Sequence, residues 1–362
     1  MNRRERKRGG GQGSERVGQL VDGRYRLCRL IGKGGMSSVY EATIEGDDRR
    51  VAIKLLHPTL ASDSDAVARL HREATILSAI KHPNICRIFG VGNTDQGSPY
   101  IVMERLCGET LARRIAKDGP FEFSDLATSL KQVLGALEAA HVKGVMHRDL
   151  KPENIFLVET RPGTKTIAKL LDFGISSYLD GGPEDRRLTR SGMVMGTPYY
   201  MAPEQARGDS SLDQRADLWA LGVVMYEALT GQRPFVANNY NTLLIEILRA
   251  RPKPLADYIP FVPEPLAALF NRALAKDSKE RFQSARAFAI AVEQVEKLWG
   301  EQGITPPMWS SDAQRRASYD RGPLSEDTEV MVSRFREDGT EVMDDSRRGQ
   351  LGTDLSETRD EE

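Results

Sequence analysis

The sequence contains no apolar run long enough to cross a membrane as a helix, which takes about 18 residues. The best candidate, residues 218–229, is short and contains Glu227. The N-terminus is basic, but Gly and Glu follow where a secretory signal peptide needs an apolar stretch. We therefore expect a soluble chain in the cytoplasm.

Cysteine is also scarce. Cys28, Cys86 and Cys107 are odd in number, far apart and free of metal-ligand spacing. This pattern indicates reduced thiols rather than a disulfide framework. A net charge of −1 gives no overall field that favours nucleic acid or a membrane surface, so we expect neither as a partner.

Apolar residues make up 40% of the chain, below the usual share, which indicates that part of its length packs no core. Residues 1–22 are rich in Arg and Gly, and residues 300–362 are rich in Pro, Ser, Gly and charged side chains. We expect a basic disordered tail and an acidic disordered tail at these two ends. One domain remains, at residues 23–299.

The pattern of the domain changes part-way along. Short β-rich runs separated by Gly and Asp occur at residues 25–28, 39–43, 51–54 and 100–103. They predict a small antiparallel sheet, interrupted by one helix over 63–80. Beyond residue 109 we expect helices, one capped by Ser124 and others at 214–230, 241–250, 265–274 and 284–298. The fold class predicted is α+β with two lobes.

Two motifs carry the chemistry. Residues 147–154 read His-Arg-Asp-Leu-Lys-Pro-Glu-Asn, and residues 172–174 read Asp-Phe-Gly. The first places the carboxylate of Asp149, the ammonium of Lys151 and the amide oxygen of Asn154 in one short loop. Phosphoryl transfer needs such a set, with a group to orient the attacking hydroxyl, a cation and a metal ligand. The pair of motifs resembles the eukaryotic-type protein kinases.

The resemblance implies a bilobal protein kinase fold that uses ATP and Mg²⁺ to phosphorylate protein substrates. Asp149 would then position the substrate hydroxyl and Lys151 would neutralise the transferring group. Asn154 and Asp172 would hold Mg²⁺. Lys151 and the run Gly-Thr-Pro-Tyr-Tyr-Met-Ala-Pro-Glu at 196–204 are similar to bacterial serine/threonine members. By this likeness, the Thr197 that follows Gly196 contacts Asp149 and Lys151.

A glycine-rich run lies between two predicted strands, at residues 31–39. Gly32 and Gly34 let the backbone close over phosphates, although Ser37 replaces the third glycine of the family. A strand rather than a helix follows, which argues against a dinucleotide-binding loop. The resemblance assigns nucleotide contacts to Ile31, Gly32, Gly34, Gly35, Val39, Ala52, Lys54, Glu73, Met103, Glu104 and Leu106.

Within this set, Lys54 is expected at the α- and β-phosphates, held by an ion pair with Glu73 of the first helix. The alternative for Glu73 is an ordinary solvated helix residue. Met103 is expected behind the adenine, and the main chain of Glu104 and Leu106 is expected to pair with the base.

The family pattern also implies structural roles. A column of side chains is expected to join the lobes, and a buried ion pair between Glu204 and Arg281 is expected to stabilise the fold without taking part in the chemistry. The column comprises Leu77, His147, Phe173 and their anchor Asp217.

Regulation is expected in the loop before Thr197. Arg148, beside Asp149, calls for an anion, and phosphorylation of Thr189 or Ser191 would supply one. Arg69, one turn before Glu73, is a second candidate ligand for that phosphate. We expect self-phosphorylation between two copies in a transient dimer.

The C-terminal tail offers further acceptors. Arg315-Arg316-Ala317-Ser318 is a basic-directed pattern, and Glu153 is a candidate to receive such a basic residue. Thr328 and Thr340 lie in echoed Thr-Glu-Val-Met segments, which suggest a phosphothreonine-binding partner.

Two other functions compete with this interpretation. A pseudokinase scaffold requires the loss of Lys54, Asp149 or Asp172, and all three are present. A small-molecule kinase on a related fold generally lacks the Ala-Pro-Glu and Gly-Thr-Pro segments, which this chain has.

Overall fold

The computed structural model describes residues 16–34, 37–57, 64–159, 166–173, 198–209, 211–259 and 262–301. These all belong to one compact unit, Met1–Met331. Several sequence predictions fall outside the described residues. They concern Gly35, the Arg69 side chain, Thr189, Ser191, Thr197 and the C-terminal tail with Ser318, Thr328 and Thr340.

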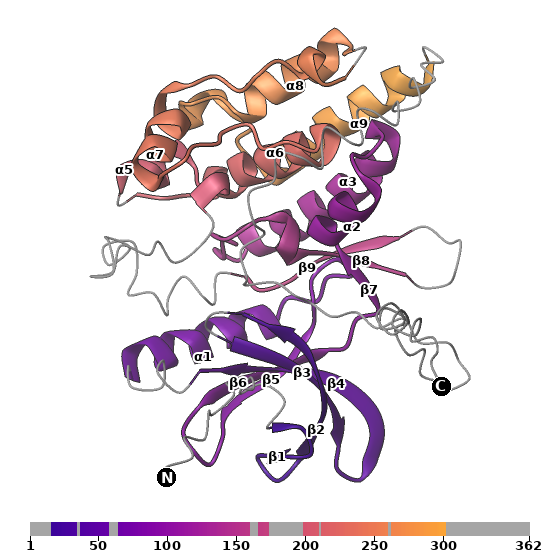
Figure 1. Cartoon of the computed structure of the whole chain (residues 1–362), viewed down its shortest axis with the longest axis vertical. Helices are drawn as coiled ribbons and strands as arrows, with labels where there is room; N and C mark the ends of the chain where they lie inside the picture. Colours follow the sequence, from indigo (N-terminus) through magenta and orange to yellow (C-terminus); the bar gives the residue numbers. More distant parts are fainter. Residues whose placement is uncertain are drawn as a thin grey trace, which may run out of the picture. The chain divides into compact units, whose positions relative to one another are not determined.

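The N-terminal part is an antiparallel sheet of order β1-β2-β3-β4-β6-β5 (Figure 1). Its strands are β1 (Leu20–Val21), β2 (Tyr25–Lys33), β3 (Ser37–Ile44), β4 (Asp47–Leu56), β5 (Ile88–Asn93) and β6 (Pro99–Glu104). All four predicted strands lie within it. Side chains alternate between its faces, and one face buries a small core that includes Tyr40, Ile53 and Val102. The opposite face carries Val39, Ala52 and Lys54.

Helix α1 (Ser64–Ser78) follows β4 and packs beside β5. The predicted helix over 63–80 is therefore confirmed with small changes at its ends. Leu70, Ala74 and Leu77 are spaced by four and three residues, so they share one buried face. Leu70 and Leu77 belong to the main core cluster, which also contains Phe173 and the helices of the C-terminal part.

The C-terminal part is mainly helical. Its helices are α2 (Leu111–Asp118), α3 (Phe123–His141), α5 (Pro203–Arg207), α6 (Arg215–Thr230), α7 (Tyr240–Arg249), α8 (Glu264–Ala273) and α9 (Ala285–Glu301). Nearly every residue of α6 is buried, from Ala216 to Thr230, so this helix forms the centre of the lobe. It ends at Gly231, whose φ of 71° is one that a residue with a Cβ adopts at a cost.

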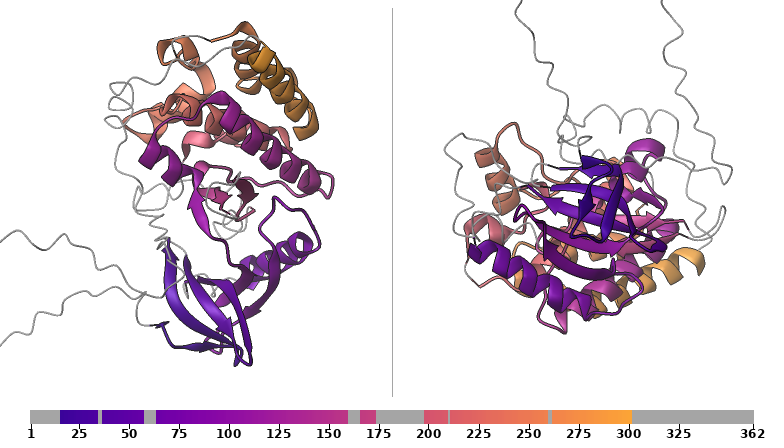
Figure 2. Two further views of the ribbon diagram at one scale, coloured as in Figure 1. Left: turned by 90° about the vertical axis from the view of Figure 1, so that its right-hand side faces the viewer. Right: turned by 90° about the horizontal axis from the view of Figure 1, so that it is seen from below.

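A small sheet of order β7-β8-β9 was not predicted. It comprises β7 (Gly108–Thr110), β8 (Ile155–Val158) and β9 (Ile167–Leu170), and it lies next to α2 and α3 (Figures 1 and 2). Gly108 lies at φ 139°, and a Cβ there would come within 2.0 Å of the Leu157 carbonyl oxygen. The close approach of β7 to β8 therefore requires glycine at this position.

Two expected boundaries were wrong. Residues up to 22 were expected to be disordered, but Leu20–Val21 form β1, where Val21 pairs with Tyr25 and is buried. The domain therefore begins before residue 23. Ser124 was expected to cap α3, but the N-cap residue is Glu122, without a side-chain cap. Among the described residues, no helix is both long and apolar enough to cross a membrane.

Candidate active site

The loop after α3 brings the three polar side chains of the first motif together. Nζ of Lys151 lies 3.1 Å from Oδ2 of Asp149. Asn154, at the end of the 3-10 turn η3 (Pro152–Asn154), donates from Nδ2 to the Asp149 carbonyl at 2.7 Å and to its Oδ2 at 3.3 Å. Burial lowers the pKa of Lys151, but the carboxylates of Asp149 and Glu153 outweigh it, so the pKa is raised and the ammonium stays charged.

Asp217 in α6 anchors the backbone of this loop. The buried carboxylate accepts the backbone N–H groups of His147 and Arg148, both at 2.8 Å, and contacts Nε2 of His141 at 2.8 Å. Arg148 has a φ of 62°, an uncommon conformation for a residue with a side chain. Charge-assisted hydrogen bonds to Asp217 from the N–H groups of this residue and of His147 before it fix the turn that presents Asp149. The expected anchoring role of Asp217 agrees with this geometry.

Asp172 is placed against the loop by backbone contacts. The N–H of Leu171 donates to the carbonyl of Asn154 at 2.9 Å, and Nε2 of His147 contacts the carbonyl of Leu171 at 2.8 Å. The ring of Phe173 lies 4.8 Å from that of His147, and Phe173 shares the core cluster with Leu77. These contacts agree with the expected column.

Lys54 of β4 reaches Asp172. Its Nζ lies 3.0 Å from Oδ1, and the lysine side chain is only 10% exposed. A buried ammonium is costly without a partner, so this ion pair gives Lys54 its orientation. Asp172 itself has a φ of 45°. The structure therefore brings together two residues that are 118 positions apart in the sequence.

The expected ion pair between Lys54 and Glu73 is not present. Among the described residues, the carboxylate that pairs with Lys54 is that of Asp172. Glu73 is half-buried on α1, and burial raises its pKa to about 7, although the charge of Arg148 acts in the opposite direction. Lys54 therefore binds the carboxylate that follows β9 and not the one on α1.

Four of the residues expected to contact the nucleotide lie on one face of the sheet. Val39 is opposite Lys54, and Ala52 is opposite Met103, so these four side chains point the same way. The turn before β3 is closed by a hydrogen bond from the Gly34 N–H to the Ser37 carbonyl at 2.8 Å. Ile31 and Gly32 lie near the end of β2, Glu104 is the last residue of β6, and Leu106 follows it by two residues.

One feature of this face was not found from the sequence. Glu41, opposite Ala52, is 1% exposed and accepts hydrogen bonds from three arginines. They are Arg29 at 2.9 Å, Arg50 at 2.6 Å and Arg105 at 2.8 Å. Burial raises the pKa of Glu41, but the bonds from Arg105 and Arg29 outweigh it and lower the pKa below its usual value. Arg105 lies between Glu104 and Leu106, so Glu41 ties this segment to β3.

The donor set fits a magnesium ion. The amide nitrogen of Asn154 is used by Asp149, which leaves its oxygen as the atom available to a cation. The carboxylate of Asp172 adds a second hard oxygen ligand, of the kind that Mg²⁺ takes. In the described part of the chain there is no group of three His, Cys, Asp or Glu that could hold a metal alone. A cation bound mainly by phosphates and water needs no such group.

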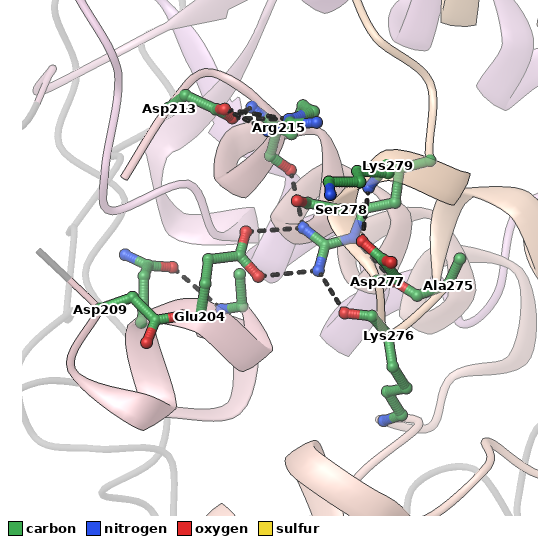
Figure 3. A network of polar contacts seen from close by, with 12 residues as sticks. Glu204, Asp209, Asp213, Arg215, Ala275, Lys276, Asp277, Ser278 and Lys279 are labelled. Atoms are coloured by element: carbon green, nitrogen blue, oxygen red, sulfur yellow. Dashed lines mark hydrogen bonds and ion pairs between the residues drawn. The ribbon is translucent and has the colours of Figure 1, made fainter. Parts of the chain in front are cut away.

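The expected pair between Glu204 and Arg281 is present. Nη1 and Nη2 of Arg281 donate to Oε1 and Oε2 of Glu204 at 2.7 and 2.8 Å, a bidentate pair. The same guanidinium donates to the carbonyls of Ala275 and Lys276 at 2.7 and 3.1 Å (Figure 3). Nη1 also donates to the carbonyl of Arg215 at 3.2 Å, so all five N–H groups of this buried guanidinium are used within the fold.

Comparison with known proteins decides the family. Residues 25–292 match the family model described as protein kinase domain. The chain belongs to the protein kinase domain family. This confirms the family and the fold that the two motifs predicted.

The relatives are bacterial. The chain is 40% identical over 285 residues to "Serine/threonine-protein kinase pkn3" of Myxococcus xanthus, covering 78% of this chain and 52% of the relative. It is 37% identical over 286 residues to "Serine/threonine-protein kinase PknA" of Mycobacterium tuberculosis (strain ATCC 25618 / H37Rv), covering 78% and 63%. The chain thus spans only about half to two thirds of the length of these relatives.

Solved structures agree. The crystal structure of the Mycobacterium tuberculosis PknI kinase domain has a TM-score of 0.61 and 27% sequence identity, covering 77% of this chain and 98% of that one. The likeness supports the arrangement of a sheet-containing lobe and a helical lobe.

Proposed function

We propose that this protein transfers the γ-phosphate of ATP to serine and threonine hydroxyls of proteins, with Mg²⁺ as the metal. The observation that carries the proposal is the ion pair of 3.0 Å between Lys54 and Asp172, beside the loop in which Asp149, Lys151 and Asn154 contact one another. The names of the bacterial relatives support the serine/threonine class.

In this proposal each residue has one task. Asp149 accepts a hydrogen bond from the acceptor hydroxyl and orients it, and most of its effect comes from positioning. Lys151, held charged by the carboxylates around it, stabilises negative charge on the group in transfer. Lys54 binds phosphate oxygens, and Asn154 and Asp172 would hold Mg²⁺, which neutralises phosphate charge when bound.

Both competing functions are weaker. A pseudokinase would not need Lys54, Asp149, Asn154 and Asp172 to be connected as they are. A small-molecule kinase has no use for the Ala-Pro-Glu segment, whose Glu204 is fixed by Arg281.

The test is transfer of labelled phosphate from ATP to a generic protein acceptor, to small alcohols and to the protein itself. We expect labelling of protein, and a loss of about a hundredfold or more in Lys54→Met and in Asp149→Asn. Lys131→Met is a matched control, because Lys131 also pairs with a carboxylate, that of Glu296, between α3 and α9. Asp118→Asn, which breaks a pair of 3.0 Å with Arg114, is the control for Asp149. Wild-type protein that labels no protein acceptor would refute the proposal.

The finer expectations on partners remain predictions from the sequence. They are self-phosphorylation in trans at Thr189 or Ser191, a phosphothreonine-binding partner for Thr328 or Thr340, and a cytoplasmic location. Phosphosite mapping of wild-type protein beside Asp149→Asn tests the first of these, because sites that persist in the variant are not its own product.

A further inference from the structure

A cluster of charged and aromatic side chains includes one residue of the catalytic loop, next to the groups proposed to bind the acceptor hydroxyl. It consists of Glu153, Tyr199, Tyr200, Glu227 and Arg233, and we call it the acceptor-side cluster. The hydroxyl of Tyr200 donates to Oε2 of Glu227 at 2.6 Å. Nε of Arg233 lies 3.7 Å from Oε1 of the same carboxylate. The guanidinium lies 4.3 Å from the ring centroid of Tyr199 and 6.0 Å from that of Tyr200.

Glu153 brings this cluster to the catalytic loop. It comes four residues after Asp149 and two after Lys151, and its charge acts on Lys151 and on Arg233. Its Oε2 is buried and has no hydrogen-bond partner among the described residues. A buried carboxylate oxygen without a donor is unfavourable, so a cation that the fold places near Glu153 is stabilising.

Arg233 is the cation that the fold itself supplies to the two carboxylates. Burial lowers the pKa of Arg233, but Tyr200 and Glu227, with a smaller effect of Glu153, outweigh it and raise the pKa. The guanidinium therefore stays charged at any pH at which the protein is folded. With Arg233 the three charged members sum to −1, and without it the two carboxylates would leave −2.

The chain holds Arg233 in place on both sides. Before it, α6 ends at Gly231, and the hydroxyl of Thr230 contacts the N–H and the carbonyl of Gln232 at 3.1 and 3.0 Å. After it, Phe235 is buried and its ring stacks on that of Trp219, with centroids 5.7 Å apart. The backbone around Arg233 is therefore fixed, and Glu227 and the ring of Tyr199 hold its guanidinium.

We infer that Arg233 occupies the position that a basic side chain of an acceptor protein would take, and so makes this enzyme discriminate against acceptors with Arg or Lys close to the phosphorylated residue. The inference rests on the proposed kinase function. Arg233 acts as a specificity-determining residue. It follows that Ser318 is a poor self-substrate, because Arg315 and Arg316 bring charge that Arg233 has already supplied.

The test compares two peptides in one enzyme. The first spans residues 312–320 with Arg315 and Arg316, and the second has alanine at both positions. The measured quantity is the ratio of their kcat/KM values, which cancels any general loss of activity. In wild type we expect a ratio of one or below. In Arg233→Ala we expect the ratio to rise about tenfold or more, which is the discrimination that a hydrogen bond to a charged group supplies.

Four further variants make the result decisive. Arg233→Lys keeps the charge and is expected to keep the wild-type ratio, while Arg233→Gln replaces the alanine variant if that one does not fold. Arg272→Ala removes another guanidinium stacked on a ring, 4.4 Å from Phe282, and should leave the ratio unchanged. Adding Glu153→Gln to Arg233→Ala should remove the gained preference.

An unchanged ratio in folded Arg233→Ala or Arg233→Gln overturns the inference. So does a wild-type ratio well above one. Affinity of the two peptides, measured by fluorescence anisotropy in the full chain, gives the same comparison without phosphate transfer. If wild type transfers phosphate to no protein or peptide, the proposed function fails, and the affinities still decide whether Arg233 excludes the basic peptide.

Discussion

The ammonium of Lys54 is bound to Asp172, with 3.0 Å between Nζ and Oδ1. This pair crosses from the strand β4 to the segment after β9, and it compensates both charges. Glu73, which the family pattern assigns to Lys54, is left in a half-buried position near the charge of Arg148. In this conformation the lysine therefore pairs with Asp172 and not with Glu73.

The pKa of Glu73 predicts a dependence of stability on pH. Burial raises this pKa from 4.5 to about 7. Because the folded value lies above the ordinary one, the stability that this group contributes is present below pH 4.5 and is lost as the pH rises through about 7. We expect the free energy of unfolding of wild type to fall more steeply across this window than that of Glu73→Gln. Urea unfolding at a series of pH values measures it.

The control for this experiment is Glu293→Gln, because Glu293 is exposed and pairs with Lys297 within α9. It should follow the wild-type curve. If Glu73→Gln also follows that curve, Glu73 is not the group that titrates. Once ionised, Glu73 is also expected to compete with Asp172 for Lys54. The rate of phosphate transfer should therefore rise with pH in wild type and rise less in Glu73→Gln.

Arg105 predicts a separation of ATP binding from turnover. Its bond to Glu41 at 2.8 Å holds the segment between Glu104 and Leu106, whose main chain is proposed to pair with adenine. We expect Arg105→Ala to raise the KM for ATP about tenfold, or ~1.4 kcal/mol, with a smaller change in kcat. Arg105→Lys should recover part of the loss, since a single ammonium can still donate to Glu41.

Arg50→Ala is the matched control for Arg105, because Arg50, a residue of β4, donates a hydrogen bond of 2.6 Å to the same Glu41 carboxylate. It removes a similar bond without touching the segment. Equal effects of the two substitutions on the KM for ATP would mean that Glu41 only stabilises the sheet.

Much of the fold was predictable because its signals are local. The β-rich composition of residues 51–54 and 100–103 and the helical spacing of Leu70, Ala74 and Leu77 each arise within one element. The sheet β7-β8-β9 was missed because its strands have only three or four residues and because β7 pairs with β8 across α2, α3 and the catalytic loop. Val21 was missed because its burial depends on pairing with Tyr25 across a turn.

In the active site, too, the contacts set by local spacing were predictable and the long-range contacts were not. The motif at 147–154 sets Asp149, Lys151 and Asn154 by short-range spacing, so the structure brings them together as expected. The partner of Lys54 was predicted wrongly, because its ion pair joins β4 to the segment after β9 and no local spacing in the sequence marks such a contact. Glu41 was missed because its three arginines come from β2, β4 and the end of β6, and only the register of the strands joins them.

The pair between Glu204 and Arg281 predicts a large and local cost in stability. Arg281 is 1% exposed, so removing one partner leaves the other charge buried without compensation. We expect Arg281→Met or Glu204→Gln to lower the free energy of unfolding by about 3–5 kcal/mol. Thermal and urea unfolding measure it. Breaking the exposed pair of Arg207 and Asp209, 3.2 Å apart, should cost at most about 1 kcal/mol.

Asp217 predicts that the turn of the catalytic loop depends on a charge and not on shape. The isosteric change Asp217→Asn replaces one carboxylate oxygen with an NH₂ group, which then faces the N–H of His147 or that of Arg148, each now bonded at 2.8 Å. Donor then opposes donor in a buried site, so we expect a loss of about 3 kcal/mol in stability and a fall in kcat that exceeds the change in the KM for ATP.

The pKa of the same carboxyl gives an independent check. Burial raises the pKa of Asp217, but the bond to His141 and the nearby charge of His147 outweigh it, so the pKa is lowered. Its stabilisation is therefore present above pH 3.8 and is lost as the pH falls through the folded value. Asp217→Asn should lose this acid-side dependence. His141→Gln, which alters one contact and leaves both backbone bonds, should keep most of the turnover, and an equal loss in both variants would place the effect in the packing of His141 and not in the turn.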